Sequence, residues 1–488
     1  MKRVNNLFFF FVVLTISWAS TGNAEPLFND EYDGIRPYRE NTWYWEYKSK
    51  PILLRGGTND DNIWQWTGKE LTDHLDLLVS VGGNYLRNTM SDRDEGNEFA
   101  FKKLESGKYD LDQWNEKYWD RFAFFLEEAN KRDIIVQITF WDWFDLMFNQ
   151  FEVHPLNPKN NVTLDAAELT GRDDYYGGSI RTANTKVLDL QKKYVDKILS
   201  MTFGYDNILY NISNESSLGM DWEFFWAQYI KSKAEEISKP VFITSMNLVP
   251  STGVRQVMMH KDLFSFAEIS QNNQDSRGAR GENHYRNLLQ WRKLIQMDPQ
   301  GPFPMNNEKI YGAADGMGMV GSIAGTSKDA EDRFWKNVFG GAASMRFHRN
   351  EGNWGLGLNE RAQKNLKALD LFLKEFDVFS SHPYEEIELI GASEGYALAI
   401  MGEKYAVYLP PGQNALRLDP WTMNESFTIK FLDIETGEWS DEKSVSLDWT
   451  ESELDHQYGY EKGLLVSRHG GNPIESHRPT VAIIEVNN

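Results

Sequence analysis

The segment Ile134-Ile135-Val136-Gln137-Ile138-Thr139-Phe140 decides the fold class. It is almost entirely apolar, as is typical of a parallel strand that is covered on both faces. The residues before it, 114–132, place aromatic and leucine side chains on one helical stripe and therefore predict an amphipathic helix. A helix followed by a doubly covered strand is the repeating unit of an α/β protein.

The same alternation continues on both sides of this segment. Strands are predicted at 51–57, 84–88, 134–140, 207–213, 241–245, 263–267, 303–307 and 342–347. Helices are predicted at 67–81, 114–132, 187–199, 221–237, 285–295, 331–338 and 361–376. These units predict an α/β fold of the (β/α)8 TIM-barrel type over residues 51–380, with a long insertion at 145–185 that we expect to narrow the site. A doubly wound open sheet is the alternative, although the first predicted strand is not followed by the glycine spacing of a nucleotide-binding loop.

The two ends of the chain have a different character. After residue 380, short strands such as 405–409 and 481–486 alternate with turn residues and predict a C-terminal all-β sandwich domain over 381–488. At the N-terminus, a basic start, an apolar run at 7–14 and the small residues Gly22-Asn23-Ala24 predict a cleaved signal peptide, 1–24. We therefore expect an N-terminal extension at 25–50 and a secreted or periplasmic protein.

The composition restricts the chemistry. The 488 residues include 51 Lys and Arg, 72 Asp and Glu, 17 Trp and no Cys, with a formal net charge of −21. Without cysteine, disulfides, thiolate metal sites and thiol nucleophiles are excluded. The negative charge argues against nucleic acid and anionic membranes as partners. No metal-binding spacing such as H-E-x-x-H occurs, so we expect neither a metal nor another cofactor.

Two carboxylates carry the functional prediction. In a (β/α)8 barrel, the chemistry lies at the carboxyl ends of the strands. The strand predicted at 207–213 leads into Asn214-Glu215, and the strand predicted at 303–307 leads into Glu308. Retaining glycosidases need such a pair about 5 Å apart, with one residue as acid/base and the other as nucleophile. The alternative for each residue is a glutamate in a surface loop.

The chain resembles the clan-A-type glycoside hydrolases, in which the acid/base Glu follows an Asn after the fourth strand and the nucleophile Glu ends the seventh. Asn214-Glu215 matches the first motif, and Glu308 fits the second less specifically. The β region, with Tyr405–Pro410 and Asp433–Trp439, is similar to the domain labelled collagen-binding that accompanies apiosidase-like barrels. The resemblance implies that Glu215 is the acid/base, that Glu308 is the nucleophile and that Asn214 holds the sugar 2-hydroxyl.

Residues at the other strand ends are further candidates for binding an oligosaccharide. They are Arg55, Arg87, Asn88, Trp141, Asp142, Asn247, Gln271, Arg346, His348 and Trp354. Polar side chains there can hydrogen-bond sugar hydroxyls, and tryptophan rings can stack on sugar faces. The alternative for each is a structural hydrogen bond or core packing.

Two other functions stay open. Arg55, Arg87, Arg346 and Arg349, if they converge, would favour an anionic sugar such as a uronate, as in ulvan-type polysaccharides. Barrels of this general appearance in marine polysaccharide-degrading bacteria resemble oligosaccharide dehydratases, which need a base and charge neutralisation instead of a nucleophile. A non-catalytic glycan-binding protein is the third alternative, but such a protein has no need of two opposed carboxylates. The sequence leaves the oligomeric state open.

Overall fold

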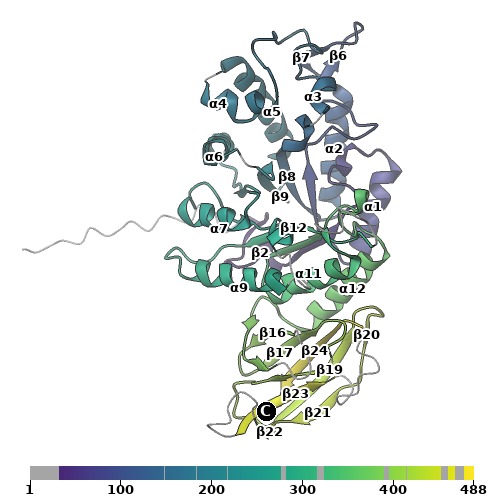
Figure 1. The fold of residues 1–488 in the computed structure, drawn as a ribbon, viewed down its shortest axis with the longest axis vertical. Helices are drawn as coiled ribbons and strands as arrows, with labels where there is room; N and C mark the ends of the chain where they lie inside the picture. The colour runs from purple at the N-terminus through teal and green to yellow at the C-terminus, as the bar shows by residue number, and fades with distance from the viewer. Residues whose placement is uncertain are drawn as a thin grey trace, which may run out of the picture. The chain divides into compact units, whose positions relative to one another are not determined.

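The computed structural model describes residues 32–487 except residues 148, 183, 217, 276–281, 316–323, 389–394, 414, 452–459 and 468–477 (Figure 1). The predicted signal peptide, 1–24, lies outside the described residues. Residues 33–488 belong to one compact unit.

Eight strands build a parallel barrel from two four-stranded sheets. The first sheet contains β5 (Tyr85–Thr89), β8 (Ile135–Asp142), β9 (Ile208–Asn214) and β10 (Ile243–Thr244), and the second contains β4 (Leu54–Gly57), β11 (Ala267–Glu268), β12 (Met305–Ile310) and β13 (Ser344–Phe347). Hydrogen bonds bridge both seams between the sheets. Asn84 N donates to Arg55 O beside β4 and β5, and Ser265 N donates to Ile243 O beside β10 and β11, both at 2.9 Å. The strands therefore form the closed (β/α)8 barrel that the alternation predicts.

A helix follows each barrel strand. These helices are α1 (Lys69–Ser80), α2 (Glu116–Lys131), α5 (Thr185–Thr202), α6 (Met220–Glu235), α7 (Pro250–Met259), α9 (Glu282–Gln296), α11 (Ser327–Phe339) and α12 (Glu360–Glu375). The loops add a hairpin of β6 (Phe101–Lys103) and β7 (Tyr109–Trp114), and the short helices α3 (Gln150–Val153), α4 (Ser179–Arg181) and α8 (Asn272–Asp275). The described parts of the loops also contain the 3-10 turns Ile63–Gln65, Trp143–Leu146 and Glu351–Asn353 and the π-helical turn Asp174–Gly178. The predicted insertion, 145–185, thus contains short helical segments.

Several of the predicted strands and helices need correction. Helix α7 was not predicted, although Pro250 is well placed in its first turn, where a missing N–H costs nothing. The strand predicted at 263–267 is reduced to β11, because the N–H groups of Leu263 and Phe264 turn back to His260 O. The strand predicted at 303–307 starts later, at Met305, and runs through Glu308 to Ile310, so Pro304 lies just outside it.

The predicted N-terminal extension, 25–50, contributes to the barrel core. Its residues form an antiparallel sheet of β1 (Arg36–Pro37), β2 (Trp45–Tyr47) and β3 (Lys50–Ile52). Residues 51–52, predicted to begin the first barrel strand, belong to this sheet, and the barrel strand starts at Leu54. Trp45 is fully buried, and its Nε1 donates to Asn306 Oδ1 at 2.9 Å. Its ring meets the edges of Phe242 and Phe266, at centroid distances of 6.1 and 5.1 Å. These partners lie at the amino ends of the barrel strands, so Trp45 closes the end opposite the expected site.

The C-terminal region consists of two antiparallel sheets. The larger contains β14 (His382–Tyr384), β16 (Tyr396–Ile400), β17 (Lys404–Leu409), β24 (Thr480–Val486), β19 (Ser426–Asp433), β20 (Glu438–Trp439) and β21 (Lys443–Ser446). The smaller contains β15 (Ile387–Glu388), β18 (Ala415–Leu418), β23 (Tyr460–Ser467) and β22 (Asp448–Glu451). Both sheets contribute to one apolar cluster, which includes Val407 and Ile484 from the larger and Leu416 and Val466 from the smaller.

The larger sheet also contacts the barrel helices. The Tyr408 ring on β17 stacks on Trp335 of α11 at 5.8 Å between centroids, and Trp335 meets Phe372 of α12. The C-terminal region is therefore joined to the barrel through an aromatic contact. In the part of the chain that the structure describes, no helix combines the length and the apolar character needed to cross a membrane.

The role of Trp45 in the barrel core can be tested by truncation. We expect Trp45→Ala to lower the free energy of unfolding by about 3–5 kcal/mol, because a fully buried ring and its hydrogen bond are lost. Trp421→Ala is the matched control, since that ring is 69% exposed and its removal should change the value by about 0.5 kcal/mol or less. Urea unfolding followed by circular dichroism measures both. Equal midpoints for the two variants would contradict the packing role.

Candidate active site

The candidate site is built on the carboxyl ends of β9 and β12. Strand β9 ends at Asn214, and Glu215 follows with a left-handed backbone, at φ 53°. This conformation costs a residue with a side chain about 1–3 kcal/mol, and such strain concentrates at functional positions. The side chain of Glu215 is 11% exposed.

A bulge in β12 turns two consecutive side chains toward the site. The register between β12 and β13 shifts between Asn307 and Ile310. Along a regular strand, neighbouring side chains point to opposite faces. Here the shift allows both Glu308 and Lys309 to contact groups inside the barrel mouth. Lys309 was not predicted, because alternation from Glu308 would have placed it on the outside.

Glu308 is fully buried beside Arg87 of β5. Arg87 Nε lies 3.3 Å from Glu308 Oε1, and Gln137 Nε2 of β8 donates to Oε2. Burial raises the pKa of Glu308, although the charges of Arg87 and Lys309 oppose this change. Arg346, a predicted site residue on β13, donates from Nη1 to the Glu308 carbonyl at 2.8 Å. The nucleophile candidate is therefore held on both its carboxylate and its backbone.

Glu268 on β11 is a second buried carboxyl in this interior. Gln137 Nε2 donates to Glu268 Oε2 at 3.1 Å, so one amide links it to Glu308. Burial, and then the charge of Glu308, raises the pKa of Glu268 to about 8. Glu268 therefore keeps its proton more readily than an exposed carboxyl does, which limits the repulsion between the two carboxyl groups.

Glu215 is paired with Lys309. Lys309 Nζ donates to Glu215 Oε1 and, at 2.6 Å, to Asn214 Oδ1. The Tyr311 hydroxyl lies 3.3 Å from the same Oε1. Burial opposes the ionisation of Glu215, yet the charge and hydrogen bond of Lys309 hold the pKa of Glu215 below its ordinary value. Glu215 is therefore ionised in this arrangement.

Asp142 completes the contacts of Asn214. The Asn214 amide donates to Asp142 Oδ1 at 3.0 Å, and Arg93 binds the other carboxylate oxygen. Burial opposes ionisation, but Arg93 and Asn214 lower the pKa of Asp142 to about 2. The side chain of Asn214 is therefore fixed at both its oxygen, which accepts from Lys309, and its amide nitrogen, which donates to Asp142.

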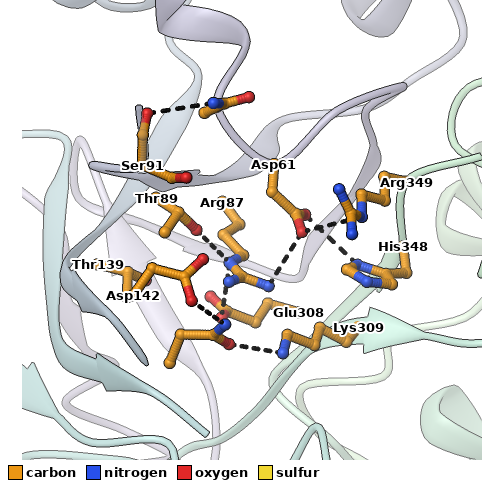
Figure 2. Close-up of polar contacts among 12 residues, drawn as sticks. Asp61, Arg87, Thr89, Ser91, Thr139, Asp142, Glu308, Lys309, His348 and Arg349 are labelled. Carbon is orange, nitrogen blue, oxygen red and sulfur yellow. Dashed lines mark hydrogen bonds and ion pairs between the residues drawn. The ribbon is translucent and has the colours of Figure 1, made fainter. Parts of the chain in front are cut away.

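Asp61, in the loop after β4, is the anionic centre of the site. Figure 2 shows it facing Arg87, His348 and Arg349, and Arg87 in turn facing Glu308. Its carboxylate lies 3.6 Å from Arg87 and from Arg349, and 3.4 Å from Arg346 and from His348. Against the effect of burial, the charge of Arg87 and the contact with His348 hold the pKa of Asp61 well below its ordinary value. Burial lowers the pKa of His348 to about 3, so that ring is neutral.

Three predicted binding residues contact the surrounding scaffold instead of the mouth. Arg55 binds Asp370 of α12 at 3.0 Å. Asn88 follows the inward-facing Arg87, so it points to the helix side, where its amide lies 3.5 Å from Met90 Sδ. Trp141 is 4% exposed and packs among other rings, namely Tyr175, Tyr176, Tyr194, Trp222 and Trp226. This packing covers Trp141 with protein, so its ring is part of the core.

Three other predicted residues lie around the mouth. The Trp354 ring is 5.6 Å from Tyr311, which stacks on His348 at 5.0 Å. Gln271 is buried after β11, with its amide 3.7 Å from Met246 Sδ. Asn247 is half-buried after β10 and bonds to Gln256 of α7 at 3.0 Å.

Three residues of the site, Asp61, Gln137 and Tyr311, were not predicted, although Asp61 belongs to a polar run directly after the first predicted strand. Among the described residues, no group of three His, Cys, Asp or Glu side chains is placed to hold a metal ion.

Comparison with solved structures establishes the fold. No protein-family model and no curated protein matches the chain. A glycoside hydrolase family 5 structure from Bacteroides vulgatus covers 93% of this chain and 94% of its own, with a TM-score of 0.62 at 12% identity. A structure described as a glycoside hydrolase gives the same TM-score and identity over 93% and 97%. A family 5 mannosidase from Rhizomucor miehei covers 71% of this chain and 99% of its own, with a TM-score of 0.50 at 13% identity.

The central role of Asp61 predicts a pH-dependent loss of stability. We expect Asp61→Asn to lower the free energy of unfolding by about 3–5 kcal/mol at pH 7, because buried arginines lose their counter-charge. A carboxyl whose pKa is lower in the folded state stabilises fully above its unfolded pKa, about 3.9, and loses this contribution as the pH falls. The difference from wild type should therefore shrink by about 1 kcal/mol between pH 7 and pH 3.

Urea unfolding at both pH values measures this difference. Asp73→Asn is the control, because Asp73 pairs with Lys69 on an exposed helix surface and should contribute about 0.5 kcal/mol or less. A pH-independent difference for Asp61→Asn would show that its charge does not stabilise the site.

Proposed function

We propose that the protein is a carbohydrate-active enzyme of the glycoside hydrolase kind, which cleaves oligosaccharides derived from plant or algal polysaccharides with retention of configuration. One observation carries this proposal: Glu215 and Glu308 extend from β9 and β12 into one buried polar network at the carboxyl end of the barrel. Chemistry in (β/α)8 enzymes is located at that end. The strained backbone of Glu215 and the glycoside hydrolases among the similar folds support the same function.

In this mechanism Glu308 attacks the anomeric carbon, and Glu215 transfers the proton. Arg87 and Gln137 orient the Glu308 carboxylate, and Arg87 favours the ionised form that a nucleophile needs. Glu215 passes a proton to the leaving oxygen and later takes one from water. Because Glu308 is fully buried, the substrate must displace neighbouring side chains when it binds.

We also propose roles for the N-terminal segment, the C-terminal sheets and Trp354. The predicted signal peptide favours a secreted or periplasmic location. We assign the two C-terminal sheets to a β-sandwich, because one apolar cluster draws residues from both. Trp354 is the ring that we propose for stacking on a sugar, since it is half-buried beside Tyr311.

Elimination from a uronate-containing, anionic sugar is the second candidate function. It is favoured by the cations of the site, Arg87, Lys309 and Arg349, and by the ionised state of Glu215, which leaves that carboxylate able to accept a proton. Elimination needs a base and a neutralised carboxylate, and it forms no bond to Glu308.

Glutamine substitutions and product mass separate these functions. For hydrolysis, we expect Glu308→Gln to abolish turnover of a cleaved oligosaccharide and Glu215→Gln to lower it about 10²- to 10⁴-fold. Glu331→Gln is the control with a buried carboxyl, because Glu331 on α11 accepts a hydrogen bond from Asn365 of α12 at 2.8 Å, away from the proposed machinery, and this variant should keep its activity. Mass spectrometry of plant and algal oligosaccharides measures turnover.

Each outcome identifies one function. Hydrolysis adds the mass of one water to the cleaved substrate, and dehydration removes the mass of one water. Elimination that expels a sugar instead gives fragments whose masses sum to that of the substrate. Full turnover by both the Glu215 and the Glu308 variants contradicts the hydrolase mechanism. Binding of a glycan without any change in mass would identify a non-catalytic binding protein.

A further inference from the structure

Lys309 is a buried lysine at the centre of the proposed machinery. Its side chain is 2% exposed, and its ammonium bonds to Glu215 and to Asn214 Oδ1. An ammonium has three N–H groups, so these two contacts use most of its donors. The bulge in β12 is what brings Lys309 here, directly after the proposed nucleophile. Burying an ammonium costs free energy, so this lysine has a role that a lysine on the protein surface does not have.

The surroundings of Lys309 make it the partner of Glu215. The charged and titratable groups that face it come from several elements: Glu215 after β9, Asp142 at the end of β8 through Asn214, Arg87 of β5, Asp61 after β4, His348 after β13, Glu308 of β12 and Tyr311 directly after β12. Asp61 and Asp142 are held ionised by other cations, whereas His348 is neutral. Burial raises the pKa of Tyr311 well above its ordinary value, so its hydroxyl keeps its proton.

The hydrolase mechanism requires a proton that Glu215 does not hold in this structure. A general acid must be protonated before it meets the leaving oxygen. The contact with Lys309 favours the carboxylate of Glu215, while burial lowers the pKa of the Lys309 ammonium despite the opposing charge of Glu215. The proton between these two side chains is therefore stored on Lys309, within one hydrogen bond of the carboxylate.

We propose that Lys309 is a positioning residue that orients Glu215 and stores the proton that Glu215 delivers to the leaving group. This inference rests on the proposed hydrolase function. In the first step, a proton passes from Lys309 Nζ to the Glu215 carboxylate and on to the glycosidic oxygen. The bond from that oxygen to the anomeric carbon breaks, and a bond from Glu308 to that carbon forms.

The second step restores the pair. Glu215 takes a proton from water and returns it to Lys309, the water oxygen bonds to the anomeric carbon, and the bond from Glu308 breaks. After one turnover the protein therefore holds the same number of protons as before. A salt bridge that only positions Glu215 would need a positive charge at residue 309, but it would not need a proton that can leave.

Two substitutions distinguish proton storage from charge alone. Lys309→Arg keeps the charge, but arginine does not give up its proton in proteins, so we expect a loss of about 10²-fold or more at every pH. Lys309→Met leaves Glu215 to hold its own proton. We expect that variant to work at acidic pH and its alkaline limb of kcat/KM to move down by about one pH unit or more. An arginine variant within about threefold of wild type, or a methionine variant with the wild-type alkaline limb, overturns the proposal.

A measurement without substrate keeps the test independent of folding defects and of the proposed function. In protein labelled at lysine ¹³Cε, the Lys309 resonance is assigned by its loss in Lys309→Arg, or in Lys309→Gln if the arginine variant does not fold. We expect it to titrate below the ordinary lysine pKa of about 10.4, and lower still in Glu215→Gln, where the stabilising carboxylate is gone. Titration at the ordinary value in both proteins overturns the proposal.

The two proposals fail in different ways. If wild-type protein changes no oligosaccharide but the Lys309 resonance shifts as expected, the hydrolase function fails and the proton pairing stands. If wild type is active and Lys309→Arg retains its turnover and pH profile, the hydrolase function stands and the role of Lys309 fails.

Discussion

The pairing of opposite charges inside the barrel mouth is the constraint on which the site depends. Arg87 is fully buried and faces both Asp61 and Glu308, and Lys309 bonds to Glu215. Taking an ion out of water is costly unless an opposite charge and hydrogen bonds compensate it. Each of these side chains therefore requires its partner, and the loops after β4 and β13 are held where they supply Asp61, His348 and Arg349.

The backbone of the site is shaped to make those pairs. The bulge in β12 brings Glu308 and Lys309 to neighbouring partners, and the left-handed conformation of Glu215 directs its carboxylate to Lys309. Both features depart from ideal strand geometry. The opposite end of the barrel is closed by the buried ring of Trp45. Left-handed residues also occur there, at Asp133 before β8 and at Ser238 before β10, but Glu215 is the one whose side chain enters the proposed machinery.

The fold and the function rest on different observations. Similar folds among glycoside hydrolase structures establish the architecture, but at 12% identity they do not transfer a reaction. The function that we propose depends on the side chains at the mouth, above all on Glu215 and Glu308. Lys309 separates this arrangement from a simple carboxylate pair, because its ammonium bonds to Glu215 and lowers the pKa of that carboxyl.

Hydrophobic periodicity is a local property, so it was enough to predict most of the alternating strands and helices and the barrel, and it placed Asn214 and Glu215 at the end of the fourth strand. Glu308 was predicted to follow the seventh strand but lies inside β12. Short elements such as α7 and β11 were missed or misplaced, since few residues carry their signal. The direction in which each side chain points could be read from the folded chain alone. In the folded protein Arg55 binds Asp370, and Trp141 packs among other aromatic rings. Lys309 lies beside Glu215. A bulge and a buried ion pair form between residues that are far apart in the sequence, so no local sequence pattern predicts them.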